Sequence, residues 1–559
     1  MAIRAPSLPQ NDDHPEFRRN HLNHKRSQYQ YIYEYFSNIA NVDGVPKQEE
    51  ADLRYNIAML KNLAFGFITS FVPLVKRYVW FKLLKRPFKE DMDYFFFANS
   101  PVPDENFLST YKTDESFALQ RVMGMNPVVL QGVTPENPLP ENLHYSELKR
   151  RFPEVISDMS LQEAKEKERL FFVDYAMLQS MEDNPGVVDG VQQYVTAPIA
   201  VFYLKDDGLL TPVAIQLRQT LALEKNPVFI PTDGEHWEVA KTFVQAADGD
   251  LHEYYTHATR VHYLIEALVL GTRRNLAFNH PINVLLTPHF QYTIQLNHNH
   301  TFLKDAKGVP GAFGALMGGD YDSSMRCMAT GLSSFNFHDM SLPNDLKNRA
   351  VENPNLFYPY RDDGQKSWDA IQKFALAYCE HYYENDEAVI NDHELQAWGA
   401  EIHSQKEGGR IHGFPQSFDT VKKVAKTVGH IIFIATAHHA AIHYSQYQYA
   451  GFVPNMPFSS YVPAPTSLDI PIKEENRIKM LPPYQPAWTQ TFTFYLTNVK
   501  VNRMGQYDME DFEKAIHPTI KVFQDDLAKI AAEIDKENET RPYPYHYMNP
   551  KTVTNSVTV

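Results

Sequence analysis

The sequence predicts a mainly α-helical protein: a large bundle around two long apolar helices, with a small antiparallel β subdomain. The first observation is the stretch Trp237–Phe290, which has no proline before Pro281 and carries apolar residues on nearly every helical face. The second is Ile431–Tyr449, another apolar stretch of helical character. The third is a group of strand-like runs between residues 170 and 217. Both apolar helices are expected in the core, where each polar side chain needs a reason for its burial.

The composition excludes several classes of protein. The chain of 559 residues can bury a large core, and its formal net charge of −15, with a pI near 5.8, argues against a nucleic-acid partner. Its two cysteines, Cys327 and Cys379, are too few for a disulfide framework. A polar stretch follows Met1, where a signal peptide would have an apolar core. We therefore expect a cytoplasmic monomer that binds no nucleic acid.

Residues 1–90 are expected to form an N-terminal helical extension or lid. Tyr29–Phe36 is predicted to be helical, although its alternation would equally suit a strand. The segment 53–89 is apolar with basic flanks, and its uncharged part, Asn62–Val75, is shorter than the roughly 20 apolar residues that cross a bilayer. This segment suits either a helix packed on the core or a peripheral contact with a phospholipid surface.

Residues 91–559 are expected to form one large domain. Residues 91–147 are rich in Pro, Asn and Asp and should be mostly loop. Asp206-Asp207-Gly208 is a hairpin signal between two of the strand-like runs. The runs themselves are residues 170–175, 197–204 and 210–217. Further helices are predicted at about 487–502 and 509–536, before an extended tail.

The first apolar helix carries two histidines at an unusual spacing. His257 and His262 are five residues apart, so on a regular helix their rings would point about 140° away from each other. One wider, π-type turn would bring both to a common side, and such turns favour functional sites. Taken alone, the pair could equally be two ordinary core or surface histidines.

The second apolar helix carries a histidine pair at regular spacing. His439 and His443 are four residues apart and share one helical face, with Gln446 a further turn along, whereas His438 points elsewhere. Neutral imidazole binds Fe, Zn, Cu or Mn, and burying it without a partner is costly. Two histidine pairs on two buried helices therefore predict a metal site.

At these residues the sequence resembles the lipoxygenase family. The first iron-binding motif of that family is His-x4-His, then Glu, an Arg-containing turn, His-Pro and Leu-Leu-x-Pro-His. It is matched by His257, His262, Glu266, Arg273 or Arg274, His280-Pro281 and Leu285-Leu286-Thr287-Pro288-His289. The second motif, His-Ala-Ala-x-(Asn/His) with a Gln three residues later, is matched by His439-Ala440-Ala441-Ile442-His443 and Gln446.

The resemblance implies a set of ligands for non-heme iron, Fe2+ or Fe3+. They are His257, His262, His439, His443 and the carboxylate of the last residue, Val559, where isoleucine is usual. The tail is nearly uncharged, interrupted only by Lys551, which supports insertion of its end into the interior. Histidine and carboxylate ligands also suit manganese, so the choice of metal stays open.

Four further positions are assigned by the same resemblance. Glu253 and Gln446 resemble a bridge behind the ligands that links the metal helices to the substrate cavity; alternatively, Glu253 is a capping or surface carboxylate. Asn299 and His300 lie about where most lipoxygenases have an Ala or Gly that influences the carbon and face receiving oxygen. Because this sequence departs from that pattern, its regio- and stereospecificity stay open.

The resemblance runs from about residue 110 to the end and indicates a bacterial-type lipoxygenase catalytic domain over residues 91–559. The lipid-binding PLAT/C2-like β-barrel of many plant and animal members needs over a hundred residues of strand pattern, so none is expected here. The small sheet predicted from the strand-like runs has a counterpart in the family.

The resemblance implies a fatty acid dioxygenase of oxylipin and lipid metabolism. A ferric hydroxide would remove hydrogen from the 1,4-pentadiene unit of a polyunsaturated fatty acid, and O2 would add to give a hydroperoxide. No side chain need act as acid or base, which fits the lack of a Ser/His/Asp or paired-carboxylate constellation. One alternative is an epoxyalcohol-forming hydroperoxide isomerase, motivated by Asn299 and His300. A second is a non-catalytic lipid-binding protein.

Overall fold

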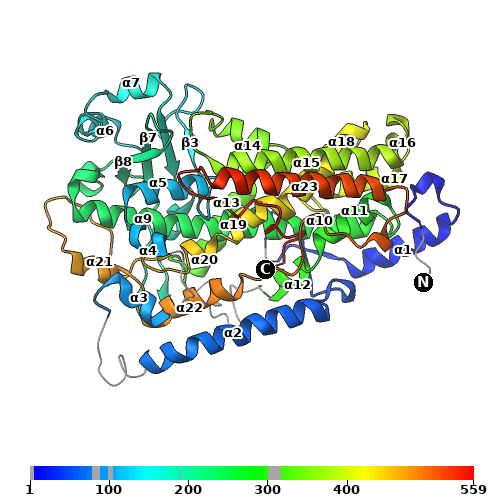
Figure 1. Cartoon of the computed structure of the whole chain (residues 1–559), viewed down its shortest axis with the longest axis horizontal. Helices are drawn as coiled ribbons and strands as arrows, with labels where there is room; N and C mark the ends of the chain where they lie inside the picture. The colour runs from blue at the N-terminus through cyan, green and yellow to red at the C-terminus, as the bar shows by residue number, and fades with distance from the viewer. Residues whose placement is uncertain are drawn as a thin grey trace.

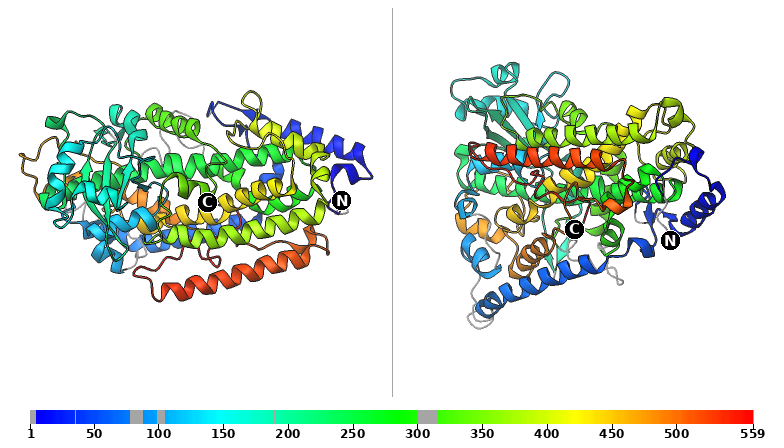
Figure 2. Two further views of the ribbon diagram at one scale, coloured as in Figure 1. Left: turned by 90° about the horizontal axis from the view of Figure 1, so that it is seen from above. Right: turned by 45° about the vertical axis from the view of Figure 1, so that its right-hand side comes forward.

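Two long helical segments run through the molecule, and the other helices pack around them in the computed structural model (Figure 1, Figure 2). The structure describes residues 5–34, 36–77, 88–98, 105–188, 190–299 and 316–558. The first segment consists of α9 (Glu235–Leu251), the π-helix η8 (His252–Tyr263) and α10 (Leu264–Asn275). The second consists of α18 (Val421–Phe433), the short π-helix η9 (Ile434–His438), α19 (His439–His443) and α20 (Gln446–Tyr449).

The first segment is continuous through Asp248-Gly249-Asp250, although aspartate and glycine have low helix propensity. Asp248 accepts a hydrogen bond from the Tyr175 hydroxyl (2.8 Å) and lies 3.2 Å from the Arg121 guanidinium, so its buried carboxylate is partnered. Gly249 allows the Phe458 ring to pack closely, because an added Cβ would lie 2.8 Å from that ring. Burial on all sides therefore outweighs the low helix propensity of this sequence.

The same segment ends before the Pro-His motif. α10 ends at Asn275, and α11 (Pro281–Phe290) begins with a proline in its first turn. The preceding residue, His280, takes an extended conformation and accepts a hydrogen bond from the Ile282 amide, capping the new helix. α11 is therefore a separate helix from α10. The helical prediction holds for most of Trp237–Phe290.

The strand-like runs form the predicted antiparallel sheet at one end of the bundle, in the order β3-β4-β7-β8-β9 (Figure 1). Its strands are β3 (Gln131–Gly132), β4 (Leu170–Asp174), β7 (Ile199–Leu204), β8 (Leu210–Gln216) and β9 (Val228–Phe229). The predicted hairpin joins β7 and β8, and its Gly208 has a φ of +84°, which favours glycine. Phe172 and Val213 pack beneath α6 (Tyr145–Arg151) and α7 (Leu161–Glu166) in a small core of their own.

The outer helices enclose both segments. The longer ones are α1 (Pro15–Gln28), α2 (Leu53–Arg77), α5 (Asp114–Met123), α13 (Tyr321–Ser334), α15 (Pro359–Tyr382), α17 (His393–His403), α22 (Tyr484–Leu496) and α23 (His517–Asn538). The shorter ones are α3 (Asp91–Ala98), α4 (Glu105–Thr110), α6 (Tyr145–Arg151), α7 (Leu161–Glu166), α8 (Gln179–Asp183), α12 (Thr293–Asn299), α14 (Leu342–Asn348), α16 (Asp386–Ile390) and α21 (Glu474–Met480). Two small hairpins pair β1 (Tyr31–Ile32) with β2 (Asn41–Val42) and β5 (Val187–Val188) with β6 (Val191–Gln192).

The helical prediction for Tyr29–Phe36 is wrong. α1 ends at Gln28, and among the described residues of this stretch Tyr31 and Ile32 form β1, so the strand alternative holds for these two residues. The Tyr31 hydroxyl donates to Glu401 (2.8 Å), and the main chain of Tyr31 pairs with that of Val42 in β2. Long-range contacts therefore selected strand over helix.

The loop prediction for residues 91–147 is also wrong, because this segment contains α3, α4, α5 and the start of α6. α5 begins where the Thr113 hydroxyl accepts from the Ser116 amide, and it buries Phe117 and Val122 against the core. Near the C-terminus, α22 starts and ends earlier than the predicted 487–502, and α23 starts later than the predicted 509. No helix among the described residues has both the length and the apolar character needed to cross a membrane.

Candidate metal centre

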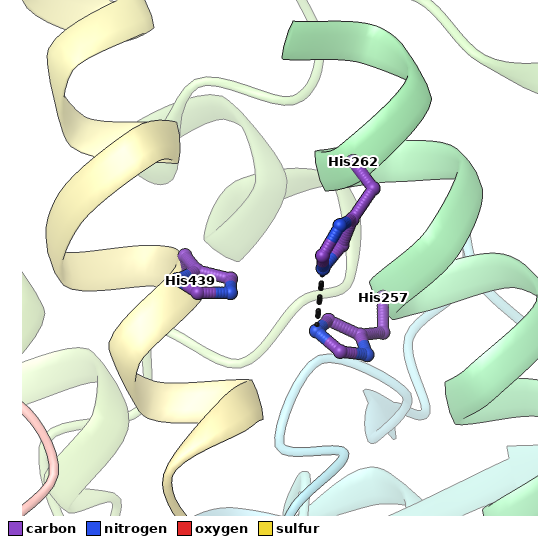
Figure 3. A group of neighbouring side chains, drawn as sticks. All are labelled: His257, His262 and His439. Atoms are coloured by element: carbon purple, nitrogen blue, oxygen red, sulfur yellow. Dashed lines mark hydrogen bonds between the residues drawn. The ribbon is translucent and has the colours of Figure 1, made fainter. Parts of the chain in front are cut away.

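The wider turn that the His257–His262 spacing required is present as the π-helix η8. It places both imidazoles on one side, with their Nε2 atoms 2.9 Å apart and their rings nearly perpendicular (Figure 3). Both residues are more than nine-tenths buried. The five-residue spacing therefore works here as a four-residue spacing works on a regular helix.

The second segment brings two more histidines to the same place. The His439 ring lies 5.7 Å from that of His257 and 5.6 Å from that of His262, centroid to centroid, and faces both in Figure 3. One nitrogen from each of these three rings lies within 4.8 Å of the other two. His443 stacks on His439 at 4.9 Å, and its Nδ1 lies 3.2 Å from His257 Nε2. The four predicted histidines thus converge on one buried point.

The outer nitrogen of three of these rings faces an acceptor. His257 Nδ1 lies 3.3 Å from Glu253 Oε2 and 3.2 Å from Gln446 Nε2, whose NH2 group donates to Glu253 Oε1 at the shorter distance of 2.5 Å. His262 Nδ1 lies 3.1 Å from Asn297 Oδ1. His443 Nε2 lies 2.9 Å from the Thr497 carbonyl oxygen. A carbonyl or carboxylate oxygen can only accept, so each outer nitrogen carries the proton and each inner nitrogen keeps its lone pair.

These tautomers fit a cation at the centre. Two lone-pair nitrogens 2.9 Å apart cannot hydrogen-bond to each other, whereas a shared ion would attract both. Two nitrogens each about 2.1 Å from one ion, at right angles, are about 3.0 Å apart. Burial lowers the pKa of His257, despite Glu253, and it lowers the pKa of His443 to about 3. Neutral, buried imidazoles of this kind form a donor set for Fe, Mn or Zn.

Glu253 and Gln446 link the two segments behind the histidines. Gln446 Nε2 donates to Glu253 Oε1 at 2.5 Å, while the other carboxylate oxygen faces His257. His252 Nδ1 lies 3.2 Å from Glu253 Oε1, and its Nε2 lies 3.1 Å from the Ile442 carbonyl on α19. Glu253 is buried and hydrogen-bonded within the bridge, which does not fit the surface or capping alternative.

The charge state of Glu253 follows from its neighbours. Burial raises the pKa of this carboxyl, but His252 and His257 outweigh burial and hold the pKa below its ordinary value. An ionised carboxylate beside His257 makes the opposite ring nitrogen a better electron donor. The bridge therefore supports both the position and the basicity of that imidazole.

The C-terminal tail runs into the interior, as its composition predicted. Residues 553–558 are buried, and the Asn555 carbonyl accepts from His289 Nδ1 at 2.7 Å. Asn502 Nδ2 donates to Ser556 Oγ at 3.0 Å. The predicted ligand Val559 lies outside the described residues. The predicted specificity residue His300 does too, and so does the side chain of Asn299, the last residue of α12.

Two contributors to the site were not predicted from the sequence. Asn297 on α12 accepts from His262, and the Thr497 carbonyl at the end of α22 accepts from His443. Asn297 has no distinct sequence signal, because it begins the polar run Asn297-His298-Asn299-His300. No residue pattern could have predicted the contact from Thr497, because any residue type supplies a main-chain oxygen. His438, adjacent to the cluster, points elsewhere, as its helical position predicted, and its Nδ1 lies 2.9 Å from the Tyr360 hydroxyl.

Comparison with known proteins agrees with this geometry. A family model described as Lipoxygenase matches residues 73–545. The hydroperoxide isomerase ALOXE3 of Mus musculus is 34% identical over 494 residues, which cover 84% of this chain and 65% of that protein. This chain therefore spans less than two thirds of that relative's length. The polyunsaturated fatty acid lipoxygenase ALOX15B of Homo sapiens is 32% identical, over 91% of this chain and 75% of that protein.

A bacterial relative and a solved structure extend the comparison. The linoleate 9/13-lipoxygenase of Pseudomonas aeruginosa is 33% identical, over 80% of this chain and 67% of that protein. The anaerobic crystal structure of a lipoxygenase in complex with arachidonate superposes with a TM-score of 0.90 at 25% identity, over 100% of this chain and 84% of that chain. The fold, the family model and several relatives agree, and the chain belongs to the lipoxygenase family.

Proposed function

We propose that this protein is a non-heme iron dioxygenase that converts polyunsaturated fatty acids to hydroperoxides at a 1,4-pentadiene unit. The carrying observation is the convergence of imidazole lone pairs from His257, His262 and His443 beside His439, in a member of this family. The carboxylate of Val559 would complete the ligand set, and the buried tail before it supports this. A bound arachidonate in a structural neighbour favours a fatty acid substrate.

In this proposal the protein side chains position groups and do not transfer protons as acids or bases. Iron, when bound, supplies the one-electron oxidation that homolytic removal of a doubly allylic hydrogen requires. Glu253, Asn297 and the Thr497 carbonyl hold three imidazoles in the tautomer that faces the centre. Gln446 ties Glu253 to the second segment and keeps the two histidine pairs in register.

The proposal is tested by product formation and metal content together. Mixing with linoleate or arachidonate and O2 should produce conjugated-diene absorbance, and elemental analysis should find iron; manganese in its place would change the assigned metal. His439→Ala should abolish both readouts. His430→Ala is the matched control, a buried histidine of the same segment that packs on Phe337 and Trp368. Full metal occupancy without product from any polyunsaturated lipid would refute the dioxygenase assignment.

A second candidate is a hydroperoxide isomerase that forms epoxyalcohols on the same centre. It is favoured by similarity to a relative named hydroperoxide isomerase and by the unusual residues Asn299 and His300. An oxygen electrode separates the two reactions, because isomerisation of a supplied hydroperoxide consumes little O2. A lipid-binding protein without catalysis would instead show an empty metal site on elemental analysis.

We also propose a phospholipid surface as a partner, bound by α2 in an N-terminal extension of residues 1–90 that precedes a catalytic domain of residues 91–559. One face of α2 docks on the body of the protein: Asn62 Nδ2 donates to the Leu496 carbonyl at 2.9 Å, and the Tyr55 ring packs 4.8 Å from that of Tyr292. A helix fixed in this way presents its opposite face to solvent.

That opposite face is apolar. Leu53, Ile57 and Leu60 follow a helical spacing and are 74%, 42% and 63% exposed. Arg54 and Lys61 flank them, so the face joins apolar side chains with positive charge in an acidic protein. Apolar side chains with basic neighbours suit the interface of an anionic membrane.

Flotation with anionic vesicles tests this partner. The protein should co-float at low salt, and combining Leu53→Gln, Ile57→Gln and Leu60→Gln should abolish co-flotation without changing activity on dispersed fatty acid. A control with Leu221→Gln, Ile390→Gln and Val522→Gln changes leucine, isoleucine and valine that are 58%, 56% and 50% exposed elsewhere. Equal flotation of both triple variants would assign the α2 face to another role.

A further inference from the structure

Asn297 is the hub of a buried polar chain behind His262. Its Oδ1 lies 3.1 Å from His262 Nδ1, and its Nδ2 donates to the His262 carbonyl at 3.0 Å and to Glu266 Oε2 at 2.7 Å. All three residues are more than nine-tenths buried. One amide therefore contacts the ring of a proposed ligand, its main chain and the carboxyl group one turn further along η8 and α10.

The carboxyl group of Glu266 decides which way this amide points. Both amide protons of Asn297 have acceptors, the His262 carbonyl and Glu266, so its oxygen must face the imidazole. An oxygen at that position accepts a proton only from Nδ1–H, which leaves the lone pair on Nε2. Glu266 thus sets the tautomer of His262 without touching the ring.

Glu266 is itself held by the N-terminal extension. Its Oε1 accepts from the Val42 amide at 3.0 Å, and Val42 belongs to β2, paired with β1. The neighbouring Phe36 packs against Tyr263 of η8 with ring centroids 4.6 Å apart. Residues 31–42 lie before residue 73, where the match to the family model begins. A segment outside that match therefore supplies the last hydrogen-bond donor in the series that ends at His262.

We infer that Asn297 and Glu266 are positioning residues for the metal ligand His262, and that the main chain of the N-terminal extension completes their support through Val42. The inference rests on the proposed function only in taking His262 as a ligand. The inference predicts that metal affinity depends on which group donates and which accepts in these hydrogen bonds. A purely structural network would affect metal affinity only through packing.

The isosteric variant Glu266→Gln tests the direction of these hydrogen bonds. Val42 and Asn297 donate to different oxygens of Glu266, and glutamine keeps an oxygen at only one of these two positions, so its NH2 group would face one of the two donors. If Asn297 turns over in response, its NH2 group faces His262 Nδ1 and forces the proton onto Nε2, toward the metal. Loss of such outer support costs about 10–100-fold in metal affinity.

The measurement is Fe2+ affinity under anaerobic conditions by chelator competition, with thermal stability recorded alongside. Glu266→Gln and Asn297→Leu should each bind Fe2+ about 10–100-fold more weakly than the unmodified protein. The matched control is Glu394→Gln, which makes the same change at a similarly buried carboxylate that pairs with Arg18. It should lower stability without changing metal affinity. Unchanged Fe2+ affinity in both test variants would overturn the inference.

A backbone variant isolates the contribution of the extension. Val42→Pro removes the amide donor, whereas Val42→Ala removes only side-chain atoms and keeps it. Weaker Fe2+ binding in Val42→Pro than in Val42→Ala is expected, and equal binding would remove the extension from the inference. Failure of the unmodified protein to bind Fe2+ would refute the proposed metal centre first, so the two failures are distinguishable.

Discussion

The two helical segments hold their histidines by different means. His257 and His262 are five residues apart on a π-helix, and the side chains of Glu253 and Asn297 fix their outer nitrogens. His439 and His443 are four apart on a regular helix, and a main-chain oxygen, that of Thr497, fixes His443. The first pair therefore depends on specific residues elsewhere in the sequence, and the second depends mainly on helix geometry and position.

This difference shows where the centre tolerates change. Side-chain support can be removed by one substitution, and it leaves a buried polar partner unsatisfied. Main-chain support persists through substitution as long as the local backbone keeps its path. We expect the first segment to be sensitive both at its two histidines and at their partners, and the second to be sensitive mainly at His439.

The largest expected effect comes from replacing one histidine of each segment by asparagine. His257→Asn should lose the metal and all activity. The shorter asparagine side chain cannot reach the centre from the π-helix and also keep the contact with Glu253. His443→Asn should retain bound metal, because the family resemblance allows Asn or His at this position. Metal content and turnover measured on both variants provide the check; equal losses would abolish the contrast between the segments.

His289, a histidine outside the cluster, is also held by a main-chain oxygen, so it tests this kind of support separately. His289 donates from Nδ1 to the Asn555 carbonyl, and its Nε2 lies 3.0 Å from the Tyr507 hydroxyl, which must donate to it. Burial lowers its pKa from 6.5 to about 4. The unfolded chain therefore takes up a proton below pH 6.5 that the folded protein refuses until about pH 4.

The resulting stabilisation is complete above pH 6.5 and is lost as the pH falls toward 4. It amounts to about 3.5 kcal/mol in the free energy of unfolding, which is the pKa shift multiplied by roughly 1.4 kcal/mol per unit. Denaturant titrations across this range should show the loss in the unmodified protein and a flatter profile for His289→Gln. Parallel profiles would mean that His289 does not titrate between the two states.

A smaller effect is expected at the bridge between the segments. Gln446→Leu leaves Glu253 with one donor fewer in a buried environment, which should cost about 2 kcal/mol of stability. Gln448→Leu on the same short helix is the control, since its partner is the Tyr547 hydroxyl and not a ligand support. Thermal denaturation and metal content of both variants would show whether the bridge matters more than the helix that carries it.

The smallest effect concerns how each segment begins. The Thr420 hydroxyl caps α18 by accepting from the Lys423 amide at 3.2 Å, whereas α9 starts at Gly234 without a side-chain cap. Thr420→Ala should therefore lower stability by about 1 kcal/mol. Thr427→Ala, which removes only a bond to the Lys423 carbonyl within the helix, should cost less. Equal costs in chemical denaturation would argue against a capping contribution.

Local sequence was sufficient for features that depend on neighbours along the chain. The spacing of His439 and His443 placed both on one face because a regular helix repeats every 3.6 residues. Asp206-Asp207-Gly208 was enough to predict the hairpin, because the left-handed conformation at Gly208 favours glycine. The motifs around both histidine pairs were enough to predict the family, and the near absence of charge in the tail predicted its burial.

Other features depended on contacts between distant segments. The spacing of His257 and His262 required a wider turn or two separate roles, and only packing against the second segment selected the turn. Tyr31 became part of a strand because its main chain pairs with Val42, and its hydroxyl meets Glu401 far away along the chain. The role of Asn297 depends on Glu266 and on the main chain of Val42, which come together only in the folded protein. Hydrogen-bond direction is a property of such assembled neighbours, and for that reason the tautomers of the histidines follow from the tertiary structure and not from the sequence.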